Sequence, residues 1–158
     1  MAIECRVVQA PAPPHVYLSG AIDEHTDLDK VFADLQQVRP DPLILNLEGI
    51  LRINSIGLRH WIPLVSQLSK SRTVVVEALS YPFVIQANNV ANLLAGVEIR
   101  SCVAPYYCSL CEMNRTIVVS AEEIRAGELA PPKDCPECGT EMEFDELEDY
   151  FAFLRRGR

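Results

Sequence analysis

The sequence predicts an α/β fold, a mostly parallel sheet with packed helices, followed by a small cysteine-containing module and a short C-terminal helix. Strand-like and helix-like hydrophobic periods alternate over residues 1–105, which is typical of a parallel sheet covered by helices. Beyond this point the chain becomes strongly acidic, and four of its six cysteines lie there in two C-x-x-C pairs. We therefore place a boundary near Pro105 and expect three parts, residues 1–105, 106–144 and 145–158.

The expected strands of the first part are short runs of β-branched or aromatic residues that end at polar or turn-forming positions. They cover residues 16–18, 43–47 and 74–76, with a further candidate at residues 5–8. Sites in open α/β sheets gather at the carboxyl ends of parallel strands. The segments 19–23 and 52–57 are therefore the places where we expect a functional surface.

Three apolar stripes with helical spacing predict helices between these strands. The stripes comprise Leu28, Val31, Phe32, Leu35 and Val38; Leu58, Trp61, Ile62, Val65 and Leu68; and Phe83, Ala87, Val90 and Leu94. Thr26 or Asp27 is expected to cap the first helix, and Ser80 the third. Pro63 lies opposite the second stripe, which predicts a kinked helix with its outer face in solvent.

Residues 16–26 (VYLSGAIDEHT) resemble the opening strand and loop of STAS domains, the fold of anti-sigma factor antagonists and sulfate-transporter tails. Residues 43–50 (LILNLEGI) and 53–58 (INSIGL) are similar to the central strand of that family and its Asp-Ser-Ser/Thr-Gly-Leu loop. Residues 78–97 resemble its last helix and the approach to its final strand, so the resemblance covers roughly residues 5–103. It implies a non-enzymatic bacterial signalling module that docks a regulatory protein, such as an anti-sigma-like kinase or a larger signalling assembly.

The resemblance also implies where the partner binds. The implied partner-binding residues are Asp23, Asn54, Ser55, Ile56, Gly57 and Leu58. In the family, a kinase phosphorylates the second hydroxyl residue of the loop, and the phosphate controls partner release. Ile56 stands at that position and has no hydroxyl, while Asn54 replaces the acidic residue. We therefore expect the phospho-switch to be lost, and we interpret Ser55 as a helix cap rather than a phosphorylation site.

The four later cysteines form the strongest motif of the chain. Cys108 and Cys111 are separated by 23 residues from Cys135 and Cys138. Two turns with this spacing can present four thiolates to one tetrahedral metal ion. Residues 106–144 resemble a zinc ribbon, with Gly139 free to take the positive φ of a knuckle. Four cysteine ligands leave no coordination position for water or substrate, so we expect one structural zinc ion.

Other functions of the metal site stay open. A rubredoxin-like iron site uses the same four thiolates and would support electron transfer, although zinc is preferred for a ribbon attached to an interaction domain. Contact between the ribbon and nucleic acid is disfavoured, because residues 106–158 carry twelve acidic and six basic side chains. A third alternative, small-ligand or nucleotide binding at the loop end of the sheet, lacks a phosphate-binding motif. No catalytic arrangement of residues stands out, so we expect no enzyme.

The remaining elements are read from local patterns. Residues 116–119 and 142–144 are expected strands, and Ser120 with Glu123 forms a capping box. Asp145 is expected to cap a helix whose apolar stripe is Leu147, Tyr150, Phe151 and Leu154. The stripe most simply packs on its own chain, with docking to a partner or a second copy as the alternative. Cys5 and Cys102 are interpreted as small buried hydrophobic residues.

The whole chain has 158 residues and a formal charge of −8, which disfavours a dedicated nucleic-acid binder. Its apolar runs are far shorter than the roughly 20 residues that span a bilayer. Its first residues, from Met1, lack the features of a signal peptide. We therefore expect a cytoplasmic protein without membrane contact, and self-association through the acidic ribbon and tail stays open.

Overall fold

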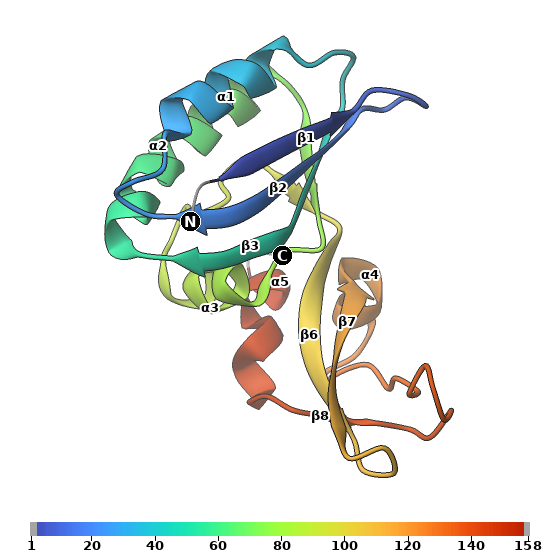
Figure 1. Ribbon diagram of the computed structural model, residues 1–158. Coiled ribbons are helices and arrows are strands. Elements are labelled where there is room, and N and C mark those ends of the chain that lie inside the picture. The colour runs from blue at the N-terminus through green and yellow to red at the C-terminus, as the bar shows by residue number, and fades with distance from the viewer. Residues whose placement is uncertain (1–2, 157–158) are drawn as a thin grey trace.

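A computed structural model describes residues 3–156, which form two sheets and their helices (Figure 1). The strands are β1 (Glu4–Val8), β2 (His15–Ile22), β3 (Leu43–Ile53), β4 (Val74–Glu77), β5 (Glu98–Ile99), β6 (Ser101–Cys108), β7 (Met113–Ser120) and β8 (Glu143–Phe144). The helices are α1 (Leu28–Gln37), α2 (Ser55–Ser71), α3 (Tyr81–Asn89), α4 (Ala121–Ala126), the 3₁₀ helix η1 (Glu148–Phe151) and α5 (Ala152–Arg155). The expectations that concern residues 1–2 and 157–158 lie outside the described residues. Among the described helices, none combines the length and the apolar character that a bilayer span requires.

The first sheet confirms the predicted α/β class. Its strand order is β1-β2-β3-β4-β5, with β1 antiparallel to β2 and the other neighbours parallel. The four strands predicted here are present, but β3 is longer than its apolar run and continues to Ile53. The reason is its neighbour: β2 extends alongside, pairing Gly20 with Ile50 and Ile22 with Ile53.

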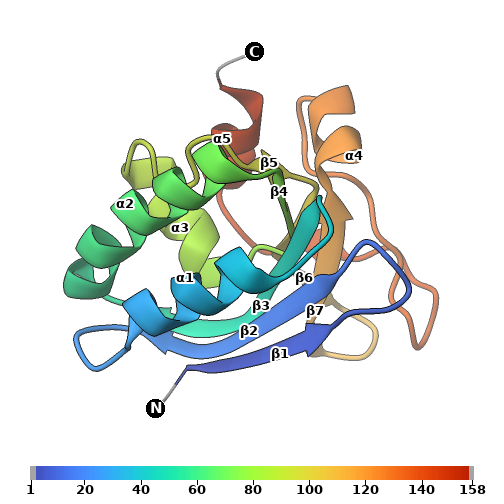
Figure 2. The ribbon, with the colours of Figure 1, turned by 90° about the horizontal axis from the view of Figure 1, so that it is seen from above.

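The three predicted helices of the first part are present, and α1 and α2 lie over the same face of the sheet (Figure 2). Aromatic side chains of all three helices meet at Trp61 of α2. Its ring centroid lies 5.2 Å from that of Phe32 in α1 and 5.1 Å from that of Phe83 in α3. Asp27 caps α1 by accepting a hydrogen bond from the Lys30 N–H at 3.1 Å. Pro63 lies inside α2 on its exposed side, as the pattern predicts.

Helix α3 is shorter than its stripe suggests. It ends at Asn89, so Val90 is extended and Leu94 lies in the following turn. Asn92 and Gly96 take positive φ values of 65° and 79°, which turns the chain back towards the sheet and ends the helical pattern. Ser80 stands at the expected capping position, but its side chain makes no capping hydrogen bond.

The second sheet is antiparallel, with the order β7-β6-β8. The predicted strands near residues 116–119 and 142–144 correspond to β7 and β8. Strand β6 begins at Ser101, so the boundary expected at Pro105 falls within a strand. Its start is bonded to the first part, since the Leu79 N–H donates to the Ser101 carbonyl at 3.1 Å and the Val103 N–H to the Leu79 carbonyl at 2.8 Å.

The C-terminal helical segment begins later than Asp145. The Asp145 N–H still donates to the Pro105 carbonyl of β6 at 3.0 Å, so this residue follows directly on β8, and Leu147 precedes the first helical residue instead. Leu147 is 72% exposed and leaves the predicted stripe, whereas Tyr150, Phe151 and Leu154 are buried. The segment therefore packs on its own chain, as the simpler interpretation predicts.

Candidate functional site

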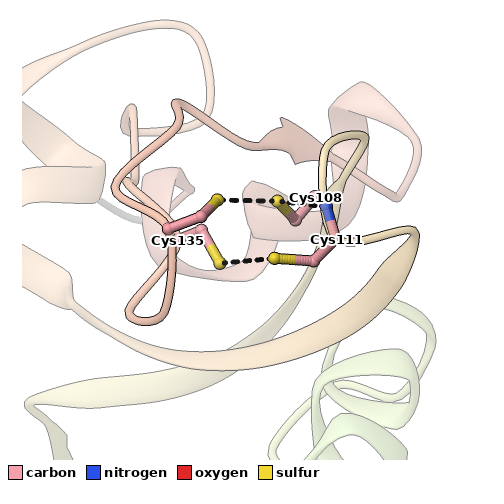
Figure 3. Close-up of side chains that lie close together, drawn as sticks. Cys108, Cys111 and Cys135 are labelled. Atoms are coloured by element: carbon pink, nitrogen blue, oxygen red, sulfur yellow. Dashed lines mark hydrogen bonds between the residues drawn. The ribbon is translucent and has the colours of Figure 1, made fainter.

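The four cysteines of the two C-x-x-C pairs lie together, with all four sulfur atoms within 4.8 Å of one another. The Sγ atoms of Cys108 and Cys138 are 3.5 Å apart, and those of Cys111 and Cys135 are 3.9 Å apart (Figure 3). A disulfide bond would need about 2.05 Å. Tetrahedral coordination with metal–sulfur bonds of about 2.3 Å places sulfurs about 3.8 Å apart. The cluster fits a tetrathiolate site and could hold a metal ion.

Both cysteine pairs lie on turns of the same design. In the first, the Cys111 N–H donates to the Cys108 sulfur at 3.4 Å. The residue directly after each pair has a left-handed backbone, with φ of 54° at Glu112 and 75° at Gly139. The positive φ at Gly139 confirms the expectation from sequence, and Glu112 adopts the same conformation without being glycine.

The thiols of the cluster affect one another's protonation. Hydrogen bonds from the Thr140 side chain and backbone lower the pKa of Cys138 to about 6, and backbone N–H groups of Cys138 and Glu137 lower the pKa of Cys135. Hydrogen bonds with Cys138 and Cys108 raise the pKa of Cys111 to about 12. Neighbouring negative charges oppose further ionisation. A bound cation removes this conflict, because it stabilises all four groups as thiolates.

A second candidate site lies where β2 and β3 end. The Asn54 N–H donates to the Ile22 carbonyl at 3.1 Å, which brings Asn54 beside Asp23. Both residues line one hollow of about 280 Å³. The Asn54 side-chain amide also donates to Glu24, a residue that the sequence patterns did not single out. The tertiary structure thus brings together the two segments that were each expected at the carboxyl end of a strand.

Asp23 is tied into its own loop. Its carboxylate accepts hydrogen bonds from the His25 N–H at 2.9 Å and from the Thr26 hydroxyl at 3.2 Å. The His25 bond, more than the Thr26 bond, lowers the pKa of Asp23. The residue is therefore a carboxylate that orders the loop, whatever else it contacts.

The cap of α2 is Asn54, which corrects the interpretation of Ser55. The Asn54 side-chain oxygen accepts from the Gly57 N–H at 2.9 Å, while Ser55 is the first helical residue and is exposed. Asn54 takes this role because it is the last extended residue before the helix. Ile56 is 54% exposed, whereas Gly57 and Leu58 are buried. Of the apolar loop residues, Ile56 is the one whose side chain reaches the surface.

The hollow beside Asp23 and Asn54 adjoins a second one of about 440 Å³, and Leu51 and Pro82 line both. We call this pair of hollows the loop groove. It is lined by Asp23, Glu48, Ile50, Leu51, Arg52, Ile53, Asn54, Ser80, Tyr81, Pro82, Val103 and Thr116. The buried Ser80 hydroxyl has no hydrogen-bond partner within residues 3–156. No sequence spacing links these segments, because β3, α3 and the second sheet meet only in the fold.

The two cysteines outside the cluster differ from each other. Cys102 is fully buried, as expected, and burial raises its pKa to about 12. Cys5 is exposed, which corrects the expectation that it is a buried residue. It lies opposite Leu18 on the edge strand β1, where one neighbouring strand flanks it.

Comparison with known proteins places the chain in no family. No protein-family model matches it, and no curated protein matches its sequence.

Proposed function

We propose that this chain is a non-enzymatic signalling module, with a STAS-like domain that docks a regulatory protein and a zinc ribbon that extends it. The observation that carries the proposal is the joining of Asp23 and Asn54 at the ends of adjacent parallel strands. Both were expected at the partner surface from the resemblance. An anti-sigma-like kinase or a larger signalling assembly is the partner that this resemblance implies.

The chemistry of the loop groove supports binding of a protein chain. Leu51 is 63% exposed and Tyr81 43% exposed, and Ile56 lies on the adjoining turn. The charged residues of the lining are Asp23, Glu48 and Arg52. Protein interfaces combine an apolar centre with a polar rim. The groove therefore suits a partner segment that carries apolar side chains flanked by charged ones.

Docking in this proposal does not depend on a phosphate at the family's usual position. Ile56 stands there, exposed and without a hydroxyl. Asn54, which replaces the family's acidic residue, is used as the cap of α2 and as a donor to Glu24. The partner is then bound constitutively or released by another signal.

Zinc is the metal that we assign to the tetracysteine centre. Residues Cys108, Cys111, Cys135 and Cys138 supply a complete tetrahedral shell, which is the arrangement of structural zinc. Its role is to hold the end of β6, which carries Cys108, against the turn that carries Cys135 and Cys138. Iron in the same thiolates would instead support electron transfer, and metal analysis separates the two.

The docking proposal is tested by placing a charge on the exposed turn. Ile56→Asp is expected to lower retention of the partner from an extract of the source cells at least tenfold, because a carboxylate there opposes burial in the interface. Leu129→Asp is the matched control, since Leu129 is 75% exposed and lies between α4 and the second cysteine pair, on neither the turn of Ile56 nor the lining of the loop groove. Quantitative mass spectrometry of the retained proteins is the readout. Equal retention by both variants and the unchanged chain would refute docking at this surface.

A further inference from the structure

Arg115 lies on the side of β7 that faces the metal ligands. In the ladder, Met113 is opposite Cys108 and Arg115 is opposite Tyr106. Directly opposite residues of antiparallel strands share a face, and so do residues two apart in one strand. Arg115 therefore points to the same side as Cys108. Its side chain is only 17% exposed.

The carboxylate beside this guanidinium does not account for its burial. Glu137 stands between Cys135 and Cys138 in the sequence, and its Oε2 lies 3.1 Å from the Arg115 Nη2 atom. Glu137 is 68% exposed, so water screens the pair. The Nε and Nη2 atoms of Arg115 are themselves buried, with no well-placed hydrogen-bond acceptor in the described part of the chain. Buried donors of a charged group are costly to leave unpaired.

The tetracysteine cluster lies beside this guanidinium. Arg115 is on the strand face of Cys108, and Glu137, whose carboxylate it meets at 3.1 Å, stands between Cys135 and Cys138. A divalent ion with four thiolates carries a formal charge of about −2. This charge lies in a segment that already holds twelve acidic and six basic side chains. A buried cation offsets it more strongly than an exposed one.

We infer that Arg115 is the charge-compensating residue of the tetracysteine centre, and that it raises the affinity of the centre for a divalent metal ion. The inference rests on the proposed metal centre. Arg115 is a positioning residue: it binds no metal, but it stabilises the thiolates that do. Loss of such a partner typically weakens metal binding about 10- to 100-fold.

The test compares zinc affinity in the full chain. Arg115→Gln, Arg115→Lys and Arg59→Gln are titrated with Zn²⁺ against a chromogenic chelator, and with Co²⁺ to record the thiolate spectrum. Arg115→Gln is expected to lose about 10- to 100-fold in affinity. Arg115→Lys is expected to lose less, because it keeps the charge but not the planar donor fork. Arg59→Gln, which removes an exposed charge on α2, is expected to match the unchanged chain.

The outcomes separate the inference from the metal centre itself. An affinity of Arg115→Gln within twofold of the unchanged chain overturns the inference. Failure of the unchanged chain to bind one Zn²⁺ overturns the proposed metal centre. Fluorescence of Trp61, the single tryptophan of the chain and a fully buried core residue, reports whether each variant is folded. If metal-free Arg115→Gln unfolds, zinc release is followed from the loaded protein, and a release rate equal to that of the unchanged chain overturns the inference.

Discussion

Gly57 is the residue at which α2 meets the end of β2. A Cβ atom at this position would lie 2.2 Å from the Ile22 carbonyl oxygen and 2.8 Å from the Asp23 nitrogen. A residue without a side chain is therefore required for the first turn of α2 to come this close. The approach also holds Asn54 beside Asp23, so one glycine shapes the proposed docking loop.

Gly57→Ala is expected to destabilise the fold by about 3 kcal/mol, because the clash is with backbone atoms that cannot rotate away. Gly127→Ala is the control, since its Cβ would have no neighbour nearer than 3.9 Å. That variant is expected to change stability by only about 0.5 kcal/mol. Denaturant unfolding followed by Trp61 fluorescence measures both. Similar midpoints for the two variants would contradict the close approach.

The burial of Arg72 is not visible in the sequence. In the sequence, Arg72 is one basic residue that follows the amphipathic pattern of α2. In the fold its side chain is 1% exposed, and Nε and Nη2 lie 2.8 Å and 2.7 Å from the Asp41 carboxylate. Nη1 donates to the Leu35 carbonyl at 2.8 Å, near the end of α1. These partners come from a distant segment, so no local pattern indicates the burial.

At the scale of elements, the capping box that begins α4 was predicted because its signals are local. The Ser120 hydroxyl accepts from the Glu123 N–H at 3.1 Å, and the Glu123 carboxylate accepts from the Ser120 N–H at 2.9 Å. The ion pair of Glu123 with Lys133, at 2.6 Å, was not predicted. It ties the helix to the chain that leads into the second cysteine pair.

Glu123→Gln is expected to make the protein less stable at pH 7 by about 0.5–1 kcal/mol, the size of a partly exposed ion pair. Burial raises the pKa of Glu123, but the hydrogen bonds from Lys133 and Ser120 outweigh it and lower the pKa below its usual value. The stabilisation is therefore present above the unfolded pKa of about 4.3 and is lost as pH falls through the folded pKa. Thermal unfolding across pH 3–7 should show the difference between the two proteins closing in acid.

The control for this prediction is Glu122→Gln, which removes a charge from the same helical turn at an exposed position. Its difference from the unchanged chain should be smaller at every pH. A Glu123→Gln difference that stays constant from pH 7 to pH 3 would show that the ion pair contributes nothing.

In the C-terminal segment, the sequence predicted which residues are buried but not where the helix begins or that its first turn is a 3₁₀ helix. Its apolar stripe predicted that Tyr150, Phe151 and Leu154 are buried, and they are. The late start and the 3₁₀ turn follow from contacts that the stripe does not encode. Asn88 of α3 donates to the Tyr150 carbonyl at 2.8 Å and accepts from the Phe153 N–H at 2.9 Å.

Over the whole molecule, β6 connects the tetracysteine cluster to the first part of the chain. It is bonded to Leu79 at its start and carries Cys108 at its end. Buried side chains of both sheets also form one continuous core. An ion that fixes Cys108 therefore acts on a strand that both parts of the chain share.

The purified protein is expected to be colourless and to carry one zinc ion per chain. Removing the zinc with a chelator is expected to lower Tm by about 10 °C, equivalent to about 3 kcal/mol for a chain of this size. Hydrogen exchange should increase first in β6 and β7. A red iron chromophore would contradict the choice of zinc, and an unchanged Tm after metal removal would contradict its structural role.

The sequence by itself determined the α/β class, the set of four clustered cysteines, the buried side of most helices and the capping box of α4. These properties depend on residues a few positions apart, where the periods of helices and strands act directly. Only the tertiary structure decided that β3, α3 and the second sheet meet at the loop groove, where Ser80 is one of the lining residues, and that Arg115 lies beside the tetracysteine cluster. Local periodicity records which side of an element is buried, whereas strand register and chain crossings decide what that side is buried against.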